Sequence, residues 1–356
     1  MRVGKNNFST LWLENKKVKI IDQTKLPFKF VIKELKTLSQ FCRAIKEMQV
    51  RGAPLIGITA AFGFAASIQE DSSDSNIKKS YNDLLNTRPT AINLKWALDL
   101  INNKLVKTIK SDKANESLEL AKIIRDDDII NCQKIALNGY KIIKDLFKKK
   151  KRRINILTHC NAGWLATIDW GTALAPIFLA NRNKIPIHVW VDETRPRNQG
   201  ALLTAWELKN ENVPYTIIVD NAGGHLMQNK KVDICIVGSD RTTKDGDVCN
   251  KIGTYLKALC AYENGIPFYV ALPSSTIDFN TSGATKVPIE ERDGKELSHS
   301  SFYKNGKIFS GNTYFKGANT INPAFDITPS KYITKLITEN GIFEPNRSDI
   351  KKCILK

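Results

Sequence analysis

The stretch INILTHCNAG at residues 154–163 decides the fold, because an apolar run of strand length stops abruptly at polar and small residues. Four later apolar runs end in the same way, at 187–191, 215–219, 234–237 and 268–272, and helical stretches lie between them. Short runs rich in Ile and Val are typical of parallel strands that are buried on both faces. We therefore predict an α/β protein with a doubly wound parallel sheet.

The polar residues that follow these runs are candidates for a binding site. In an open parallel sheet a ligand lies beyond the carboxyl ends of the strands, and the five runs would bring their polar ends to that edge together. Cys160 follows the first run and Asp240 follows the fourth. A thiol and a carboxylate at one edge of the sheet indicate an enzyme whose active site contains both groups.

Each of these two residues also has a structural explanation. Cysteines are usually buried in a core, and Asp240 is followed by Arg241, with which it could form an ion pair. For Cys160 we expect a helix within 165–183 directly after the strand, and the positive end of that helix would lower the pKa of the thiol. Local sequence leaves both explanations open.

Three other segments carry groups that suit an anionic ligand. The motif RGAP at residues 51–54 is either an anion site at a helix start or a turn before a packed helix. Asn250 and Lys251 follow the fourth run, and we expect them to begin a helix, with Asn250 as its N-cap. Lys251 suits a phosphate, although it could be an ordinary surface lysine, and Gln199 suits a sugar hydroxyl, although it could be a polar helix start.

The composition is that of a globular protein with a sizeable core: 356 residues, 42% hydrophobic and 25% charged. The net charge of +18 is compatible with nucleic acid or with an anionic substrate. The densest basic run, at 148–153, has no interleaved aromatic residues, so we interpret it as a solvated helix end and predict no specific nucleic-acid partner.

The remaining composition signals concern location and cofactors. Seven cysteines without a pattern suit a reducing cytoplasm, and neither a signal peptide nor an apolar stretch of membrane-spanning length is evident. We therefore expect a cytoplasmic protein without membrane partners. The four histidines lack metal-ligand spacing, and no glycine-rich nucleotide fingerprint occurs, so we expect no metal and no cofactor.

The chain divides into two predicted domains. Residues 1–130 form a smaller, mostly helical domain, with a hairpin of 8–13 and 17–22 and helices at 37–48, 53–66 and 92–105. Residues 131–356 form the domain that contains the sheet, and a helical pattern at 115–147 leads into it. We also expect a helix at 330–339 and a surface excursion at 296–319.

Nine stretches together identify a family. They are 51–57, 88–94, 158–172, 191–208, 220–227, 238–254, 264–278, 289–292 and 322–329. In combination they closely resemble the methylthioribose-1-phosphate isomerase family, which is related to the regulatory subunits of eukaryotic initiation factor 2B. The resemblance covers most of the chain. It implies a homodimer in which a smaller N-terminal domain lies on a Rossmann-like C-terminal domain.

The resemblance also implies an activity and a set of site residues. The family interconverts an aldose and a ketose, 5-methylthioribose 1-phosphate and 5-methylthioribulose 1-phosphate, in methionine salvage. The position of Cys160 is essential in the family, and the position of Asp240 is the proton donor. The substrate-binding positions are Arg51, Gly52, Ala53, Arg88, Gln199, Asn250 and Lys251.

Related activities remain as alternatives. Trp164, the pair Asp169-Trp170 and the segment 303–317 depart from the family pattern, so a related isomerase acting on 5-deoxyribose 1-phosphate or ribose 1,5-bisphosphate is the first alternative. A non-catalytic regulatory protein is the second, and retention of all nine site residues argues against it. For the isomerase we expect Asp240 to be neutral through burial and to protonate the ring oxygen. Cys160 would act either as a base or beside a direct hydride shift.

Overall fold

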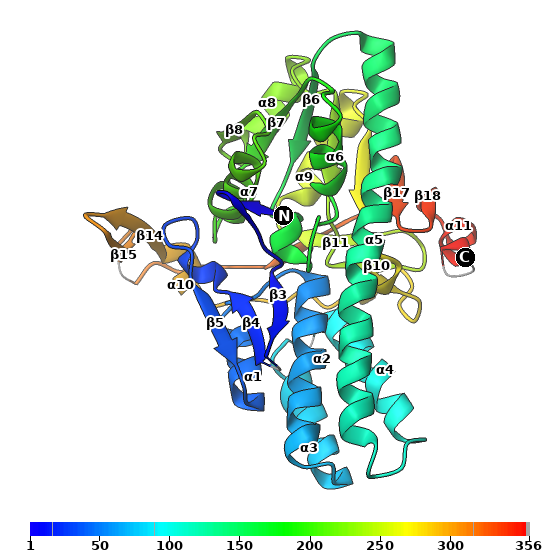
Figure 1. Cartoon of the computed structure of the whole chain (residues 1–356). Helices are drawn as coiled ribbons and strands as arrows, with labels where there is room; N and C mark the ends of the chain where they lie inside the picture. Colours follow the sequence, from blue (N-terminus) through cyan, green and yellow to red (C-terminus); the bar gives the residue numbers. More distant parts are fainter. Residues whose placement is uncertain (16, 89, 316, 354–356) are drawn as a thin grey trace.

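The computed structural model describes residues 1–15, 17–88, 90–315 and 317–353. Its largest element is a seven-stranded sheet in the order β18-β17-β12-β9-β6-β7-β8 (Figure 1). The strands are β6 (Ile154–Thr158), β7 (Ile187–Asp192), β8 (Tyr215–Ile218), β9 (Ile234–Val237), β12 (Phe268–Ala271), β17 (Lys335–Thr338) and β18 (Gly341–Phe343). Every neighbouring pair is parallel except β17 with β18. The predicted parallel sheet is confirmed.

The strand order places a crevice at the carboxyl ends of β6 and β9. From β6 the chain proceeds to β7 and β8 on one side, and then crosses to β9, β12 and β17 on the other side. Connections that leave two adjacent strands in opposite directions open a crevice between them, and ligands bind there. Cys160 follows β6 and Asp240 follows β9, so the topology itself brings the two predicted catalytic residues together.

Helices bury both faces of this sheet, which explains the uninterrupted apolar runs. Ile156 belongs to the core beneath α5 (Lys113–Lys150) and α6 (Ala175–Arg182). Leu157, the next residue along β6, belongs to the core on the other face, beneath α8 (Ala222–Gln228) and α9 (Thr254–Glu263). Because successive side chains of a strand point to opposite faces, both faces need apolar residues.

The N-terminal part is a separate layer below the sheet in Figure 1. It contains an antiparallel sheet, β3-β4-β5, and four helices: β3 (Leu11–Glu14), β4 (Lys17–Ile21), β5 (Ile32–Leu35), α1 (Leu38–Lys46), α2 (Ala53–Glu70), α3 (Asp74–Leu85) and α4 (Ile92–Leu105). The hairpin and the helices predicted there are confirmed, although Lys16 in the hairpin turn lies outside the described residues. Helix α2 is buried on nearly all sides, as its apolar composition requires, and the other helices pack around it.

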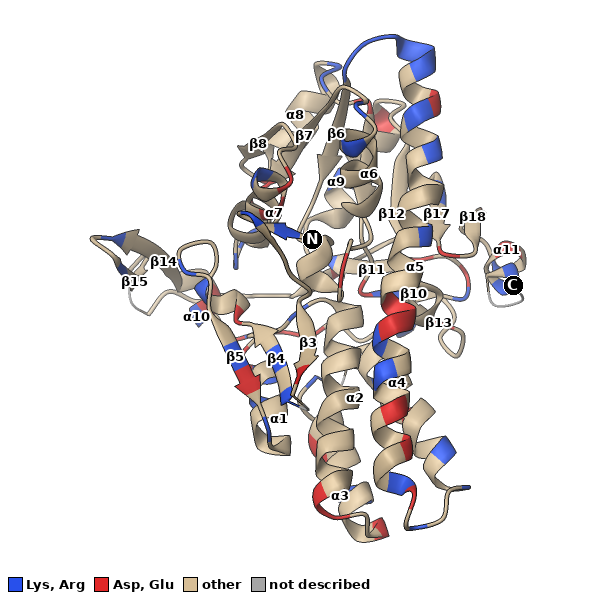
Figure 2. Cartoon of the chain, viewed as in Figure 1, with Lys and Arg blue, Asp and Glu red and all other residues tan. Residues whose placement is uncertain are grey.

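Helix α5 joins the two layers. It has 38 residues and runs along one side of the whole molecule, from the N-terminal layer to the basic run at its end (Figure 1; blue in Figure 2). The predicted boundary at 130/131 falls within this helix and stays a prediction. Asp233, whose side chain is almost fully buried, holds Lys150 at 2.6 Å and Arg152 at 2.7 Å. Two cations of the basic run are therefore ion-paired. The run directly precedes β6, so it lies at the amino ends of the parallel strands, away from the crevice at their carboxyl ends.

A smaller sheet covers one side of the crevice. Its order is β13-β10-β11-β16, with β13 (Ile277–Asp278), β10 (Arg241–Thr243), β11 (Val248–Lys251) and β16 (Phe325–Thr328). The expectation that Asn250 and Lys251 begin a helix is wrong, because both lie in β11 and pair with Asp326 and Phe325. The helix begins at Thr254, after Gly253 turns the chain with φ of 100°.

Two other helix expectations are corrected by the structure. The segment 330–339 forms a 3₁₀ turn (Ser330–Tyr332) and then β17 rather than one helix, because Leu336 and Ile337 are each fully buried, in the cores on opposite faces of the sheet. The segment 165–183 is helical only at its ends, in a short 3₁₀ turn at Trp164–Ala166 and in α6. The segment 200–210 forms a π turn (Gly200–Thr204) followed by α7 (Ala205–Asn210).

The predicted excursion at 296–319, of which Lys316 lies outside the described residues, contains a projecting hairpin. Helix α10 (Lys295–Ser298) leads into β14 (His299–Lys304) and β15 (Lys307–Asn312), which extend away from the body in Figure 1. Short elements complete the chain near its ends: β1 (Arg2–Val3), β2 (Asn6–Asn7) and α11 (Arg347–Lys352). Within the described residues, no helix is long and apolar enough to cross a membrane.

Candidate active site

The nine predicted site residues line one cavity at the crevice. They are Arg51, Gly52, Ala53, Arg88, Cys160, Gln199, Asp240, Asn250 and Lys251, and the cavity has a volume of about 710 Å³ including the part open to solvent. They come from the start of α2, the loop before α4, the ends of β6 and β9, the turn after β7, and β11. Residues from both layers and from the small sheet therefore meet at this one place.

Cys160 occupies a strained backbone position directly after β6. Its φ is 66°, in the left-handed region that costs a residue with a side chain roughly 1–2 kcal/mol. Two threonines fix this conformation: the Cys160 N–H donates to Oγ1 of Thr194 at 2.8 Å, and Oγ1 of Thr204 donates to the Cys160 carbonyl at 2.7 Å. Strain of this kind gathers at functional sites, where the surrounding structure holds it in place.

The expected lowering of the Cys160 pKa is wrong. Burial raises the pKa of the thiol, while the nearby cations Arg51 and Lys251 oppose the rise. The positive end of a long helix does not follow Cys160, because only a three-residue turn comes next and α6 begins at Ala175. The thiol is therefore predominantly protonated at neutral pH in the unliganded protein.

Asp240 meets the expectation of a carboxyl group with a raised pKa. Burial raises the pKa of Asp240, against the opposing effect of Lys251, Arg88, Arg51 and Arg292. The structural alternative, an ion pair with Arg241, is not formed. The Arg241 guanidinium instead lies 3.3 Å from Asp278 and donates to the carbonyl of Thr90.

A group of cations faces Asp240 across the cavity: Arg51, Arg88, Lys251 and Arg292. Lys251 is only 4% exposed, so it is not a surface lysine; its ammonium donates to the Ala324 carbonyl at 2.6 Å. Burial, with repulsion from Arg292, lowers the pKa of Lys251 to about 8. The Nε atoms of Arg51 and Arg88 are buried and donate no hydrogen bond to any described residue. Donors left free in this way suit an anionic ligand.

The start of α2 adds a second anion-binding feature. Gly52 has φ of 93° and lies against Ala166, where a Cβ atom would come within 2.6 Å of the Ala166 backbone. Gly52, Ala53 and Pro54 all line the cavity, so the positive end of this 18-residue helix faces it. The RGAP motif is therefore at once a packed helix start and a cavity wall. Pro89, which follows Arg88, lies outside the described residues.

Two amides complete the predicted set. The side chain of Asn250 donates to Oγ1 of Thr254 at 3.0 Å, which ties β11 to the start of α9. Gln199 is 6% exposed, and its Oε1 accepts no hydrogen bond from the described residues. An unpaired amide oxygen in a cavity wall suits a ligand hydroxyl.

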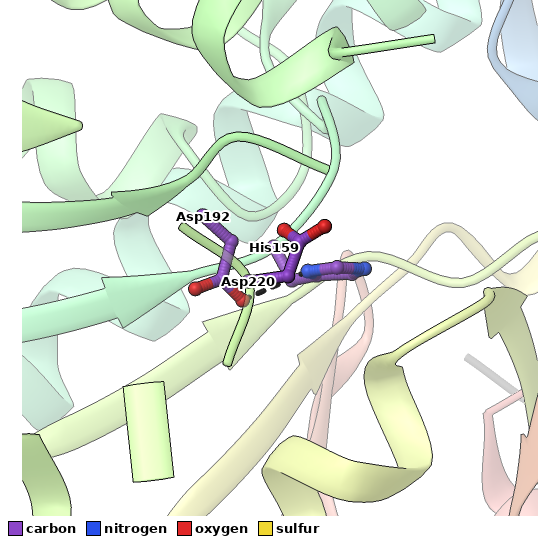
Figure 3. Close-up of side chains that lie close together, drawn as sticks. All are labelled: His159, Asp192 and Asp220. Atoms are coloured by element: carbon purple, nitrogen blue, oxygen red, sulfur yellow. Dashed lines mark hydrogen bonds and ion pairs between the residues drawn. The ribbon is translucent and has the colours of Figure 1, made fainter. Parts of the chain in front are cut away.

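Three side chains at the edge of the cavity, the buried His159 and Asp192 and the partly exposed Asp220, have the separation of a metal site (Figure 3). However, Nδ1 of His159 lies 2.8 Å from Asp192, and its Nε2 lies 2.8 Å from the Ile252 carbonyl. Both ring nitrogens thus face acceptors. The Lys257 ammonium lies 3.2 Å from Asp192, and Asp220 accepts two backbone N–H bonds. Oδ1 of Asp192 accepts no hydrogen bond from the described residues, but both nitrogens of His159 and both oxygens of Asp220 are already engaged, so the donor set does not fit a metal.

The cavity contains residues that the candidate list omits. Arg292 is one of them: its side chain is 8% exposed and lies against Glu290 and the ring of Phe325. It belongs to the stretch 289–292 that carried the family resemblance, which was the available signal. Met48 and Asn161 also line the cavity. No spacing pattern in the sequence marks these two as site residues.

The arrangement combines three chemical capabilities. Clustered guanidinium and ammonium groups with a helix start can bind a phosphate. A carboxyl group whose pKa is raised can donate a proton, and a thiol on the adjacent strand faces the same space. The cavity therefore suits acid-assisted chemistry on a small phosphorylated molecule.

Comparisons with known proteins agree on the family. The model of the Initiation factor 2 subunit family matches residues 49–345. Methylthioribose-1-phosphate isomerase from Escherichia coli O45:K1 (strain S88 / ExPEC) is 52% identical over 353 residues, covering 98% of this chain and 95% of that protein. The crystal structure of 5-methylthioribose 1-phosphate isomerase from Pyrococcus horikoshii OT3 is 35% identical with a TM-score of 0.85, covering 98% and 96%. Translation initiation factor eIF-2B, subunit delta, from A. fulgidus is 34% identical with a TM-score of 0.79, covering 98% and 100%.

Proposed function

This chain belongs to the initiation factor 2 subunit family, and from that premise we propose that it is a methylthioribose-1-phosphate isomerase. It converts 5-methylthioribose 1-phosphate to 5-methylthioribulose 1-phosphate, the reaction that its isomerase relatives are named for. One observation supports this function above all others. All nine residues that the family resemblance assigns to the site line a single cavity, with Cys160 and Asp240 directly after the two strands where the sheet order reverses.

The phosphate would bind among the cations. Arg51, Arg88 and Lys251 surround the space in front of the α2 start, and the free Nε atoms of the two arginines offer donors to phosphate oxygens. Arg292 adds a further positive charge, and it lies beside Arg88 because both pair with Glu290. A dianion bound there offsets the mutual repulsion that helps to lower the pKa of Lys251, so phosphate binding and protonation of Lys251 favour each other.

Asp240 would supply the proton for ring opening. The phosphate on the C1 oxygen prevents the sugar from opening to a free aldehyde, so the bond between C1 and the ring oxygen must break with a proton delivered to that oxygen. Burial raises the pKa of Asp240 and so favours the protonated form that this step needs. A bound phosphate would raise that pKa further.

Hydrogen then moves from C2 to C1, and the C2 hydroxyl becomes the ketone. In one route Cys160 removes the C2 hydrogen as a proton, and an enediol-type intermediate is reprotonated at C1. In the other, a hydride passes directly from C2 to C1, the C2 hydroxyl loses its proton, and Cys160 remains a thiol beside the reacting carbons. The raised pKa of Cys160 and its partly buried position favour the hydride route.

The regulatory relative does not change this conclusion. The A. fulgidus protein is named as an initiation factor subunit and shares the fold. A purely regulatory protein has no need of a buried carboxyl group with a raised pKa opposite a strained cysteine and four cations. Enzymatic activity accounts for this arrangement and regulation alone does not.

We further propose that the enzyme is a homodimer. Helix α5 exposes three apolar side chains at heptad spacing, Ile123, Ile130 and Leu137, which are 53%, 47% and 53% exposed. A stripe of this kind on a helix suits a helical face of a second copy. Sedimentation velocity on the wild type and on an I130K/L137K double variant tests the proposal. A dimer that becomes a folded monomer supports it, and a wild-type monomer refutes it.

We also propose that it acts in the cytoplasm, in methionine salvage. The seven cysteines all lie in the described part of the chain, and all are free, which suits a reducing compartment.

Turnover of purified protein tests the central proposal. The protein is incubated with 5-methylthioribose 1-phosphate and, in parallel, with 5-deoxyribose 1-phosphate, and ketose formation is measured. Faster turnover of the methylthio sugar supports the assignment. A preference for the deoxy sugar points to the related isomerase, and binding without turnover of either points to the regulatory alternative.

A further inference from the structure

We infer that Glu207 is a positioning residue for phosphate binding, acting through Asn161 on Arg51; this inference rests on the proposed function. Glu207 lies in α7 and is fully buried behind the cavity wall. It is not among the residues that line the cavity. A fully buried carboxylate this close to an active site needs a reason, because burying a charge is costly unless its hydrogen bonds are satisfied.

Three donors converge on the Glu207 carboxylate. Oε1 accepts from Nδ2 of Asn161 at 2.8 Å and from the Leu165 N–H at 3.2 Å, and Oε2 accepts from the Trp164 N–H at 2.9 Å. The loop packs directly on the carboxylate, since a Cβ atom on Gly163 would lie 1.8 Å from Oε2. Glu207 therefore holds the loop that follows Cys160.

The carboxylate also decides which way the Asn161 amide points. Both oxygens of Glu207 already accept backbone N–H groups, so the Asn161 group that faces Oε1 is its NH₂ group, which donates. Oδ1 of Asn161 then faces the cavity, where it accepts from Nη2 of Arg51 at 2.7 Å. The same Nη2 donates to the Asn161 backbone carbonyl at 3.0 Å.

The result is a chain of hydrogen bonds from a buried carboxylate to a proposed phosphate ligand. Nη2 of Arg51 is held by Asn161, while its Nε stays free and buried. The guanidinium is thus fixed, with its Nε–H available for a phosphate. Fixing a binding group before the ligand arrives lowers the ordering cost of binding. Loss of Glu207 should therefore weaken phosphate binding more than it slows the chemical step.

The variant E207Q tests this chemistry at constant shape. Whichever way the new amide is placed, its NH₂ group meets either the Trp164 N–H or the Asn161 NH₂. Asp128 offers a matched control, because it is also buried and accepts the N–H of Ile168 from the same loop. Burial raises the pKa of both carboxyl groups to about 7. Asp128 has no hydrogen bond to Asn161 or Arg51 among the described residues.

Binding of inorganic phosphate is measured by calorimetric titration, and KM and kcat are measured with 5-methylthioribose 1-phosphate. We expect E207Q to weaken phosphate binding and raise KM by about tenfold, with kcat reduced by less than about threefold. D128N should leave both affinities within about twofold, even if both variants lose similar thermal stability. Phosphate titration does not depend on turnover, so an inactive wild type would refute the proposed function without deciding this inference.

Three outcomes would overturn the inference. They are phosphate affinity of E207Q within twofold of wild type, an equal loss in D128N, and a fall in kcat with KM unchanged. A double-variant cycle adds a further test: in an R51K background, E207Q should cost little additional affinity, because the group it positions has gone. If E207Q does not fold, N161A breaks the same chain in the middle and must weaken phosphate binding instead. Unchanged affinity there refutes the inference.

Discussion

Replacing Asp240 with Asn removes the acidic proton that is proposed to reach the ring oxygen, while the rest of the site keeps its shape. The amide keeps the shape of the carboxyl group and stays neutral. Burial raises the pKa of Asp240 and so favours its protonated form, and a bound phosphate favours that form further. D240N therefore imitates the charge state proposed for the complex, although it cannot donate the proton.

The expected magnitude follows from this argument. Loss of a general acid costs about 10²–10⁴-fold in kcat, which corresponds to roughly 2.7–5.4 kcal/mol of activation free energy. The affinity for phosphate should change by less than about threefold, because the four surrounding cations face a neutral group both in D240N and in the protonated wild type. If Asp240 were ionised in the complex, its removal would instead strengthen phosphate binding, because a negative charge beside the phosphate would be lost.

The assay measures kcat and KM for 5-methylthioribose 1-phosphate, with phosphate titration and thermal unfolding as checks on the fold. D278N is a useful control, because Asp278 pairs with the adjacent Arg241 and does not line the cavity. It should lose stability while keeping kcat within about threefold. A D240N enzyme with kcat within a few fold of wild type would remove Asp240 from its proposed role.

Four further predictions follow from the same contacts. Iodoacetamide should inactivate the enzyme by labelling Cys160, and phosphate should slow this labelling. The reaction should be faster at alkaline pH, because burial raises the pKa of Cys160. Inactivation through labelling of Cys249, whose pKa burial raises to about 12, would contradict the assignment. G52A should lose more than ~1 kcal/mol of stability and raise KM, measured by denaturant unfolding and kinetics, since its Cβ would clash with Ala166; wild-type values would refute the close approach. D233N should destabilise the protein by ~1–3 kcal/mol at pH 7 without changing kcat. Burial alone would raise the pKa of Asp233, but its hydrogen bonds lower it, so the wild-type advantage is present above the ordinary aspartate pKa of ~3.9 and lost below it in unfolding curves; a pH-independent difference would contradict the pairing. Turnover in D₂O should place little deuterium at C1 if hydride moves directly, and full incorporation, seen by mass spectrometry, would establish the enediol route.

The sequence predicts the sheet well because its strands are buried on both faces. Runs such as 154–157 and 234–237 contain no polar residue except Asn155, and each has strand length. The segment 330–339 misleads because Ile333 and Ile337 have helical spacing, whereas their β-branched shape and a vacant place beside β12 favour a strand. Pairing with β12, which is distant in the sequence, is a tertiary interaction, and local periodicity carries no information about it.

The candidate site likewise has features that the sequence predicts and features that depend on distant segments. Cys160 and Asp240 can be predicted from the ends of parallel strands, because strand topology fixes where those ends meet. The local structure of Asn250 and Lys251 cannot, because these two residues pair with Asp326 and Phe325 of β16, more than seventy positions away. The pKa of Cys160 could not be predicted either, since burial by distant segments outweighs the local helix turn on which the expectation depended.

The most direct test of the account is to follow the reacting carbon itself. Wild-type protein, C160S and D240N are each incubated with 5-methylthioribose 1-phosphate labelled with ¹³C at C2, and ¹³C NMR spectra are recorded over time. The account predicts that wild type moves the C2 signal into the ketone region, while neither variant does so within many wild-type half-times. A wild-type spectrum that keeps its C2 signal unchanged, or a variant that forms ketone as fast as wild type, would contradict it.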